Sequence, residues 1–291
     1  MELNEILKTA VDRGASDVHL SPLTPPIIRF NTRLIELNDT VLEKEELEQM
    51  ALGILGDKAH RVFMVEGEID TSYRIEGVGN FRVNIYRHQG MVAIAARIIQ
   101  TKIPDLEYLG LPVTIASLAR YSSGLILITG PTGNGKSTTM ASMIDIINSE
   151  RACHIVTLED PVEYIHQNKK SYITQREMGI DSKDFAQALR ASLRQDPDVI
   201  MIGELRDLET ISTAITAAET GHLVLATLHT INAAQTVERM IDVFPSTHQQ
   251  QVRIQLSNCL RAVISQRLLP NITNERMVVA TELMICTNAI R

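Results

Sequence analysis

The pattern of hydrophobic and polar positions changes near residue 100 of this 291-residue chain. Before that point, short apolar runs predict strands, and a charged segment at residues 43–55 predicts a helix among them. The expected strands cover residues 16–20, 27–30, 33–37, 70–75, 80–86 and 91–98. Residues 1–100 are therefore predicted to form a small α+β domain.

A segment rich in structure-breaking residues follows this domain. Residues 101–112 contain Pro104, Gly110 and Pro112, and such residues interrupt helices and strands. We therefore expect a linker at residues 101–115.

The remainder of the chain alternates apolar strands with helices. The expected strands cover residues 125–128, 154–158, 199–202 and 223–228. The expected helices cover residues 137–148, 185–193, 208–221, a segment that reaches Phe244 and Pro245, and residues 249–265. Uninterrupted apolar strands that alternate with helices are typical of a parallel sheet buried on both faces. Residues 116–291 are therefore predicted to form an α/β domain with a largely parallel sheet.

Composition excludes some classes of protein. The net charge of −7 argues against a general nucleic-acid-binding protein. No apolar run approaches the ~20 residues of a membrane-spanning helix, and the first residues lack the features of a signal peptide. The three cysteines are far apart and are expected to be reduced core thiols. We expect a cytoplasmic protein that meets a membrane only as part of a larger complex.

Residues 130–138 carry the clearest chemical signal. They match the phosphate-binding loop G-x-x-x-x-G-K-[ST], between an expected strand and an expected helix. Lys136 can supply positive charge to the β- and γ-phosphates, and the Ser137 hydroxyl can ligate Mg²⁺. The candidate binding residues are Gly130, Pro131, Thr132, Gly133, Asn134, Gly135, Lys136, Ser137 and Thr138. The loop predicts that the chain binds a nucleoside triphosphate.

Carboxylates follow two of the expected strands. Glu159, Asp160 and Glu163 come after residues 154–158, and Glu204 comes after residues 199–202. Hydrolysis needs one carboxylate for the attacking water and one for the metal and its water shell. Because Gly203 occupies the usual Asp position of a Walker B motif, Glu204 is expected to act on Mg²⁺ directly or through water. At least one of the first three carboxylates is expected to be only a turn or cap residue.

Two histidines bracket the strand expected at residues 223–228. His229 lies at its carboxyl end, where it can donate a hydrogen bond to a γ-phosphate. His222 lies at the opposite end, and a structural role is equally compatible with its position.

Four motifs in order closely resemble the secretion ATPase superfamily, and most closely the type IV pilus retraction ATPases. The motifs are residues 130–138, 157–163, 203–207 and 220–224, which look like the Walker A, aspartate box, Walker B and histidine box. Further similar segments are residues 14–20, 81–84, 175–177, 241–245 and 289–291. The resemblance covers nearly the whole chain.

The resemblance implies a PAS-like N-terminal domain, a RecA-like P-loop ATPase domain and a homohexamer with ATP between the domains. It also implies that Arg82 and Arg97 reach the phosphates, with the neighbouring subunit contributing. By chemistry alone Arg87 is an equal candidate. The implied cofactor is Mg²⁺, and the implied partner is an inner-membrane pilus platform protein at the cytoplasmic face, in twitching motility. No stable nucleic-acid partner is expected.

Two features bear on the subtype. Pilus-assembly and type II secretion ATPases carry a longer N-terminal region and usually a four-cysteine zinc module, and this sequence has neither. In retraction ATPases the sequence Ala-Ile-Arg opens a motif that continues into a helical tail. Here the sequence ends at Arg291, so the tail is expected to be missing or removed by truncation.

We therefore expect an ATP hydrolase that powers pilus retraction. Glu163 is the expected general base, Glu204 the metal ligand and His229 the γ-phosphate sensor, although the two glutamate roles can be exchanged. The alternatives are a pilus-assembly, type II secretion or conjugative-transfer ATPase, and a nucleotide-regulated scaffold. A small-molecule kinase is a weaker alternative, because no acceptor pocket or lid is marked. The sequence does not single out residues that contact adenine.

Overall fold

The computed structural model describes residues 2–30, 33–99, 102–272 and 277–290, and the chain divides into two units, residues 1–101 and 102–291. The two units are considered in turn. The expected end of the first domain, the first residue of the expected linker and Arg291 lie outside the described residues.

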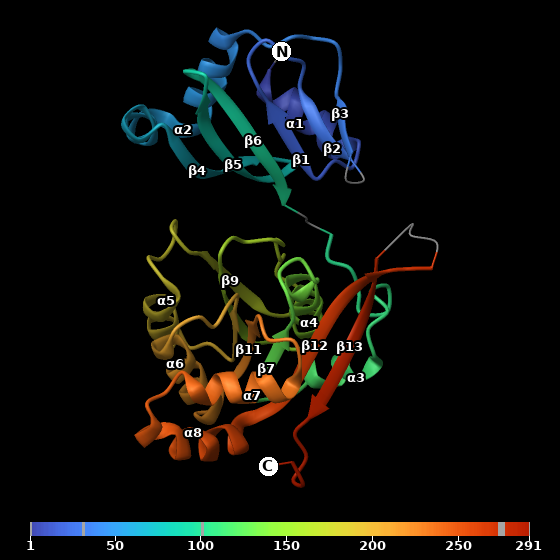
Figure 1. Ribbon diagram of the computed structural model, residues 1–291, viewed down its shortest axis with the longest axis vertical. Coiled ribbons are helices and arrows are strands. Elements are labelled where there is room, and N and C mark those ends of the chain that lie inside the picture. Colours follow the sequence, from blue (N-terminus) through green and yellow to red (C-terminus); the bar gives the residue numbers. More distant parts are fainter. Residues whose placement is uncertain (1, 31–32, 100–101, 273–276, 291) are drawn as a thin grey trace. The chain divides into compact units, whose positions relative to one another are not determined.

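The first unit contains a six-stranded antiparallel sheet with the order β3-β2-β1-β6-β5-β4 (Figure 1). Its strands are β1 (Asp17–Leu20), β2 (Ile27–Phe30), β3 (Arg33–Glu36), β4 (Glu68–Ile75), β5 (Gly79–His88) and β6 (Met91–Ile99). Its helices are α1 (Leu3–Asp12) and α2 (Lys44–Glu66). Alternate residues of β5 and β6, among them Val83 and Ile94, pack against both helices in one core. The expected α+β character is confirmed, whereas the PAS-like assignment stays a prediction.

The second unit contains a seven-stranded sheet with the order β13-β12-β7-β11-β10-β8-β9. The strands are β7 (Gly124–Thr129), β8 (His154–Glu159), β9 (Tyr172–Glu177), β10 (Val199–Ile202), β11 (Leu223–Leu228), β12 (Leu260–Pro270) and β13 (Met277–Ile285). Of these described strands, β13 pairs antiparallel with β12, and the other neighbours pair in parallel. The predicted α/β fold with a largely parallel sheet is confirmed.

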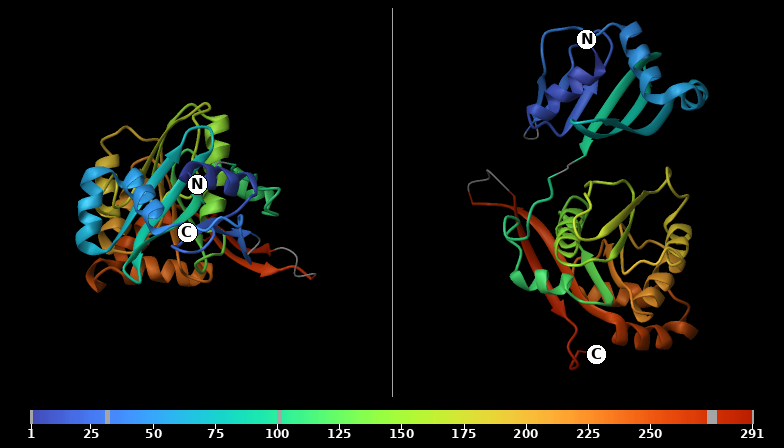
Figure 2. Two further views of the ribbon diagram at one scale, coloured as in Figure 1. Left: turned by 90° about the horizontal axis from the view of Figure 1, so that it is seen from above. Right: turned by 180° about the vertical axis from the view of Figure 1, so that it is seen from behind.

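Helices cover both faces of this sheet (Figures 1 and 2). The helices are α3 (Val113–Ala119), α4 (Lys136–Glu150), α5 (Phe185–Ser192), α6 (Leu208–Glu219), α7 (Ala233–Asp242) and α8 (Ser246–Cys259). Ile126 and Ile128 of β7 pack in a core with α3 and α4. Leu125 and Leu127 of the same strand pack in the core with α5 to α8. Both faces of the strand are therefore buried, which explains its uninterrupted apolar sequence.

One predicted helix is wrong in its second half. Residues 249–265 were expected to be helical, but α8 ends at Cys259 and β12 begins at Leu260. Val263 and Ile264 are buried in the cores on opposite sides of the sheet. A short, fully apolar run of this kind cannot be distinguished from a buried helix by periodicity. The elements α1, α3, β9 and β13 were not predicted, and α2 continues beyond the expected residue 55 to Glu66.

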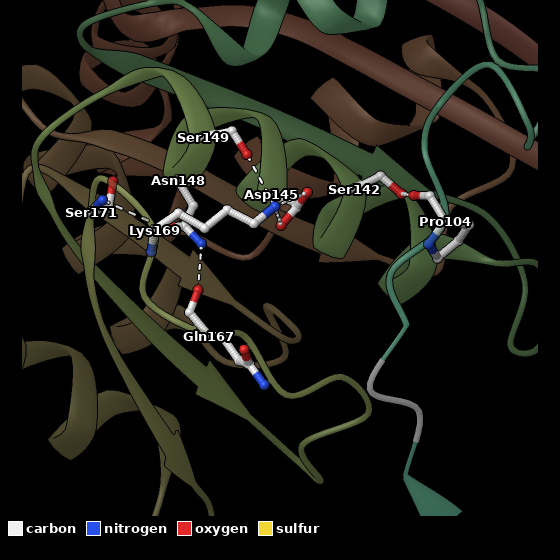
Figure 3. Close-up of polar contacts among 8 residues, drawn as sticks. All are labelled: Pro104, Ser142, Asp145, Asn148, Ser149, Gln167, Lys169 and Ser171. Carbon is white, nitrogen blue, oxygen red and sulfur yellow. Dashed lines mark hydrogen bonds and ion pairs between the residues drawn. The ribbon is translucent and has the colours of Figure 1, made fainter.

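The segment before α3 packs against α4 within the second unit. Leu106 and Leu111 are buried in the core that contains α4. The Ser142 hydroxyl of α4 donates a hydrogen bond to the Pro104 carbonyl oxygen at 2.6 Å (Figure 3). The chain between residues 104 and 111 is therefore tied to the helix that follows the phosphate loop.

Candidate active site

The phosphate loop leaves β7 and enters α4 through glycines in conformations that other residues rarely adopt. Gly130, Gly133 and Gly135 have φ angles of 142°, 76° and 78°. A Cβ atom on Gly130 would lie 2.3 Å from the carbonyl oxygen of Gln266, so the loop approaches β12 closely there. Gly135 is the N-cap of α4 and provides no side-chain cap. The first N–H groups of α4 therefore stay available for an anion.

Lys136 is buried at the start of α4. Its Nζ donates to the carbonyl oxygens of Gly130 and Pro131 at 2.9 and 3.1 Å. Burial lowers the pKa of this ammonium group, and the charges of Glu204 and Glu163 partly oppose that shift. The cation is thus directed at the loop and shares its surroundings with both candidate carboxylates.

Two residues of β12, Gln266 and Leu268, support the phosphate loop, and the sequence did not predict these contacts. Gln266, 2% exposed, donates from Nε2 to the Asn134 carbonyl oxygen at 2.7 Å and accepts from Thr139 Oγ1 at 3.0 Å. The Leu268 N–H donates to Asn134 Oδ1 at 2.8 Å. Because the partners are more than 120 residues apart in the chain, no local motif could have indicated these contacts.

The far end of α4 is fixed by a buried asparagine (Figure 3). Asn148 Nδ2 donates to the Gln167 carbonyl oxygen at 2.8 Å, and its Oδ1 accepts from the Lys169 N–H at 3.0 Å. The Lys169 ammonium group also contacts both Asp145 carboxylate oxygens, at 2.7 and 2.8 Å. These contacts join α4 to the segment that follows Glu163 in the chain.

A pocket of about 480 Å³ lies where the phosphate loop meets the carboxyl ends of β8, β10 and β11. Its lining brings together the predicted residues Lys136, Ser137, Glu163, Glu204 and His229, and it also includes the carboxylates Glu159 and Asp160. Thr132, Gly133, Gly135 and Thr138 of the loop also line it, whereas Gly130, Pro131 and Asn134 complete the loop outside the lining. The carboxyl ends of parallel strands are the usual ligand site of such sheets.

Glu204 is held between the side chains of Arg206 and His229. Its carboxylate lies 2.7 Å from Arg206 Nη2 and 3.1 Å from His229 Nε2. Burial raises the pKa of Glu204, but the hydrogen bonds from Arg206 and His229 outweigh it and hold this pKa below its ordinary value. Glu204 is therefore ionised at neutral pH and suited to a metal ion. Arg206, which also lines the pocket, was not among the predicted site residues.

The unusual glycine of the Walker B segment has a local steric reason. A Cβ atom on Gly203 would lie 3.2 Å from the Leu158 carbonyl oxygen and 3.5 Å from Glu159 Cα. The Gly203 N–H donates to that Leu158 oxygen at 2.7 Å. An aspartate at this position would crowd the adjoining strand, so the carboxylate function falls to Glu204.

The carboxylates at the end of β8 and directly after it differ in their environments. Glu163 is exposed and lines the pocket. Glu159 is 6% exposed, and burial raises its pKa to about 7, although hydrogen bonds from Thr157 and Gln175 lower it. Glu159 is thus buried and about half protonated at neutral pH, while Asp160 and Glu163 are exposed carboxylates of the pocket.

The two candidate histidines, His222 and His229, also differ in their surroundings. His229 faces the pocket beside Glu204. His222 Nδ1 lies 2.9 Å from the Ala217 carbonyl oxygen, near the end of α6. That contact gives His222 a structural partner in its own helix–strand connection.

A second pocket of about 490 Å³ adjoins the phosphate loop. It shares Gly135, Thr138 and Leu268 with the first pocket. The rest of its lining is mostly apolar and consists of Tyr108, Leu109, Gly110, Leu111, Thr139, Gln266, Met277, Val278 and Val279. A largely apolar cavity beside a polyphosphate site has the character required by a nucleobase.

Arg82 and Arg97 lie on the sheet of the first unit and are not part of either pocket. They are register partners on β5 and β6. Arg97 Nε donates to Asp17 Oδ1 at 2.9 Å, and Arg82 Nη2 lies 3.9 Å from an oxygen of Asp70. Both arginines alternate with the residues that pack against α1 and α2, so they occupy the face of the sheet without helices.

Within the described ranges, no group of three or more His, Cys, Asp or Glu residues is arranged to hold a metal ion. In the same part of the chain, no helix has both the length and the apolar character to cross a bilayer.

This chain is similar to a known protein family and to several known ATPases. The family described as type II/IV secretion system protein matches residues 1–287. PilT of Pseudomonas aeruginosa, a type IV pilus retraction ATPase, is 44% identical over 291 residues, which are 100% of this chain and 84% of PilT. The type IV pilus ATPase PilU of that organism is 42% identical over 270 residues, 93% and 71% of the two chains. A crystal structure of the pilus retraction motor PilT with bound ADP has a TM-score of 0.94 and 48% identity, with 100% and 84% covered.

Proposed function

This chain belongs to the type II/IV secretion system protein family, and we propose that it is a Mg²⁺-dependent, homohexameric ATPase that powers type IV pilus retraction. It is an ATP hydrolase with the α/β fold of PilT. The proposal is supported most directly by one pocket that holds a phosphate loop beside Glu163 and Glu204. The similarity to PilT supports the pilus as the cargo.

The phosphates bind at the start of α4. The free N–H groups of its first turn and the Lys136 ammonium group supply the positive charge. The Ser137 hydroxyl and the ionised Glu204 carboxylate are hard oxygen donors in the same pocket, and such donors fit Mg²⁺. When bound, Mg²⁺ supplies charge that stabilises the phosphoryl oxygens during transfer. These two residues therefore hold the metal, directly or through water.

Glu163 accepts a proton from the attacking water, since it is an exposed carboxylate of this pocket and its charge acts on Lys136. His229 donates to the γ-phosphate and at the same time holds Glu204. Glu204 and Glu163 thus have separate roles, one for the metal and one for the water. A titration of nucleotide binding with Mg²⁺ distinguishes this assignment from the exchanged one.

The adenine ring occupies the second pocket. Gly135, Thr138 and Leu268 border both pockets, so one nucleotide can extend from the phosphate site into the apolar cavity. Tyr108 and Val279, from two different segments of the chain, supply apolar surface for the base. Replacement of Val279 by aspartate is expected to weaken ATP binding and to leave the structure of the phosphate loop unchanged.

In the proposed homohexamer, Arg82 and Arg97 act on the phosphates of a neighbouring subunit. Their position on the sheet face opposite α1 and α2, with the Arg97 side chain 72% exposed, supports this role. The assembly works at the cytoplasmic face of the inner membrane, against a pilus platform protein.

Turnover is tested by phosphate release from purified Lys136→Ala protein. Loss of one preorganised cation is expected to lower the rate by at least about 10²-fold. A folded variant that releases phosphate at the rate of the unmodified protein would exclude the assigned site. A nucleotide-regulated scaffold, the alternative from another class, predicts ATP binding without turnover in the unmodified protein as well.

The cargo is tested by deletion of the gene and inspection of surface pili. Retraction predicts pili that form and fail to retract, with loss of twitching motility. Failure to form pili would support a pilus-assembly ATPase, and unchanged pili would support secretion or conjugative transfer. Because the type IV pilus ATPase PilU is also similar to this chain, any second pilus ATPase gene of the same cell is deleted in parallel.

A further inference from the structure

Side chains of β9 hold the loop that carries Glu163, and we propose that Gln175 is the positioning residue that sets the place of Glu163 in the pocket. The Glu163 loop is defined here as residues 160–166, between β8 and β9. The inference rests on the proposed role of Glu163 as general base. It assigns a role to a strand that is absent from the pocket lining.

Gln175 uses its whole amide group on this loop. Its Nε2 donates to the Tyr164 carbonyl oxygen at 2.8 Å and to Glu159 Oε1 at 3.0 Å. Its Oε1 accepts from the His166 N–H at 2.8 Å. The amide offers two donor hydrogens and one acceptor oxygen, so each has a partner. No other side chain of this length can make the same three bonds.

A second side chain on the same face of β9 holds the other side of the loop. Glu177 Oε2 accepts from the Val162 N–H at 3.1 Å. Gln175 and Glu177 are two residues apart on a strand, so both point to one side of the sheet. Glu163 lies between Val162 and Tyr164, and each of these neighbours is bound to a β9 side chain. The backbone on both sides of Glu163 is therefore fixed.

Contacts with α4 fix the same loop relative to the phosphate loop. The Tyr164 hydroxyl lies 3.0 Å from Thr138 Oγ1, a residue of the phosphate loop. Directly after the loop, Asn148 of α4 binds the Gln167 carbonyl oxygen (Figure 3). The Glu163 carboxylate is thus an exposed group on a backbone that is anchored to both β9 and α4. A change at Gln175 moves that carboxylate and leaves the anchors at α4 in place.

The inference predicts a specific kinetic defect for Gln175→Met, which keeps the length of the side chain and loses all three hydrogen bonds. A displacement of about 1 Å at a reacting group costs on the order of 10²-fold in rate. We expect kcat to fall by about 10- to 100-fold. The KM for ATP and the affinity for a non-hydrolysable analogue should change by less than about threefold, because no phosphate-binding group is altered.

The matched control is Thr174→Val on the same strand. Thr174 Oγ1 contacts His154 Nε2 at 3.0 Å, and within the described residues no side-chain hydrogen bond joins Thr174 to the Glu163 loop. This variant loses one hydrogen bond of β9 and should keep its kcat. Equal losses in Thr174→Val and Gln175→Met would show that β9 acts only through general stability, and would overturn the inference.

A double-mutant cycle separates positioning from structural support. If Gln175 acts through Glu163, then Gln175→Met should lower the residual single-turnover rate of Glu163→Gln by less than about twofold. An equal fold loss in both backgrounds would overturn the inference. If Gln175→Met does not fold, Gln175→Leu and Gln175→Glu are compared in the same cycle.

Different results would contradict the proposed role of Glu163 and the proposed role of Gln175. If Glu163→Gln keeps its full rate, the base assignment is wrong, and the positioning role falls with it. If Glu163→Gln is inactive while Gln175→Met turns over normally, only the positioning role is wrong.

Discussion

Glu204 Oε1 lies 3.1 Å from His229 Nε2, and the two side chains follow the neighbouring parallel strands β10 and β11. The same carboxylate binds Arg206 on its other oxygen. A histidine placed between a candidate metal ligand and the phosphate site can report on both. If His229 senses the γ-phosphate as proposed, this contact connects that role with the orientation of Glu204.

His229→Ala should lower the rate of ATP hydrolysis by about 10²-fold, because one donor to the developing charge is lost. The hydrogen bond from His229 also helps to keep the pKa of Glu204 low, so that pKa should rise in the variant. Phosphate release and nucleotide affinity are measured together, and affinity should change little. A variant with unchanged kcat would show that His229 only packs beside Glu204.

Glu163→Gln and Glu204→Gln should both bind ATP and fail to hydrolyse it. A neutral isostere keeps the shape of the side chain and loses the basic or metal-binding charge. Nucleotide affinity is measured across a range of Mg²⁺ concentrations. Glu204→Gln should need more Mg²⁺ for half-maximal binding, whereas Glu163→Gln should not. The reverse pattern would mean that the two roles are exchanged.

Some of this site could be predicted from the sequence because its chemistry is local. The phosphate loop is nine consecutive residues, and the glycines that its backbone needs are visible in them. The strands that end at Glu204 and His229 are continuous apolar runs, which buried parallel strands require. Local sequence therefore predicted the pocket and most of its reactive groups.

The supporting residues could not be predicted, because their partners are distant in the chain or their strands lack a clear pattern. Gln266 looked like a residue beyond a helix end, yet it holds Asn134, 132 residues earlier. Strand β9 is mostly polar and was not predicted, although residues 175–177 were among the segments that carried the resemblance. The difference between Glu159 and Glu163 depends on burial, which only the folded chain defines.

Gly130→Ala should destabilise the protein more than Gly133→Ala. Both glycines have positive φ angles, so each alanine is strained by about 1–2 kcal/mol. At Gly130 the new Cβ atom also meets the Gln266 carbonyl oxygen at 2.3 Å, whereas at Gly133 it meets no atom within 4 Å. Thermal unfolding of both variants gives the comparison. Equal shifts would mean that β12 moves away from the loop without cost.

Glu159→Gln should change how stability depends on pH. Burial raises the pKa of Glu159 from 4.5 to about 7, so the folded protein binds more protons than the unfolded chain between these values. The free energy of unfolding then falls as pH rises through that window. The glutamine keeps the oxygen that accepts from Thr157 and does not ionise. Glu159→Gln should therefore abolish this fall in the free energy of unfolding, which amounts to at most about 3 kcal/mol.

The measurement is denaturant unfolding of both proteins at pH 5 and pH 8, at one protein concentration. The unmodified protein should lose more stability than Glu159→Gln between these pH values. If the two curves stay parallel, Glu159 is ionised in the folded protein, and its buried environment is more polar than the structure indicates.

Arg97 is predicted to act across a subunit interface. It lies on β6 of the first unit, more than thirty residues before the phosphate loop, with its side chain 72% exposed and held by Asp17. An Arg97→Ala subunit should fold and bind ATP at its own loop, but hydrolyse it slowly. Mixed with Lys136→Ala subunits, it should regain activity, because some interfaces then combine an intact loop with an intact arginine.

The mixing experiment needs hexamers whose composition is verified, since separate rings of each variant cannot complement each other. The amount of recovered activity depends on random assembly and on whether sites fire in sequence, so the prediction concerns its existence. Arg82→Ala, at the register partner of Arg97, tests the second arginine in the same way. Suppose that no ratio restores activity, while the unmodified protein stays active when mixed with either variant. Arg97 then acts within its own subunit or supports the sheet through Asp17, and the shared site is wrong.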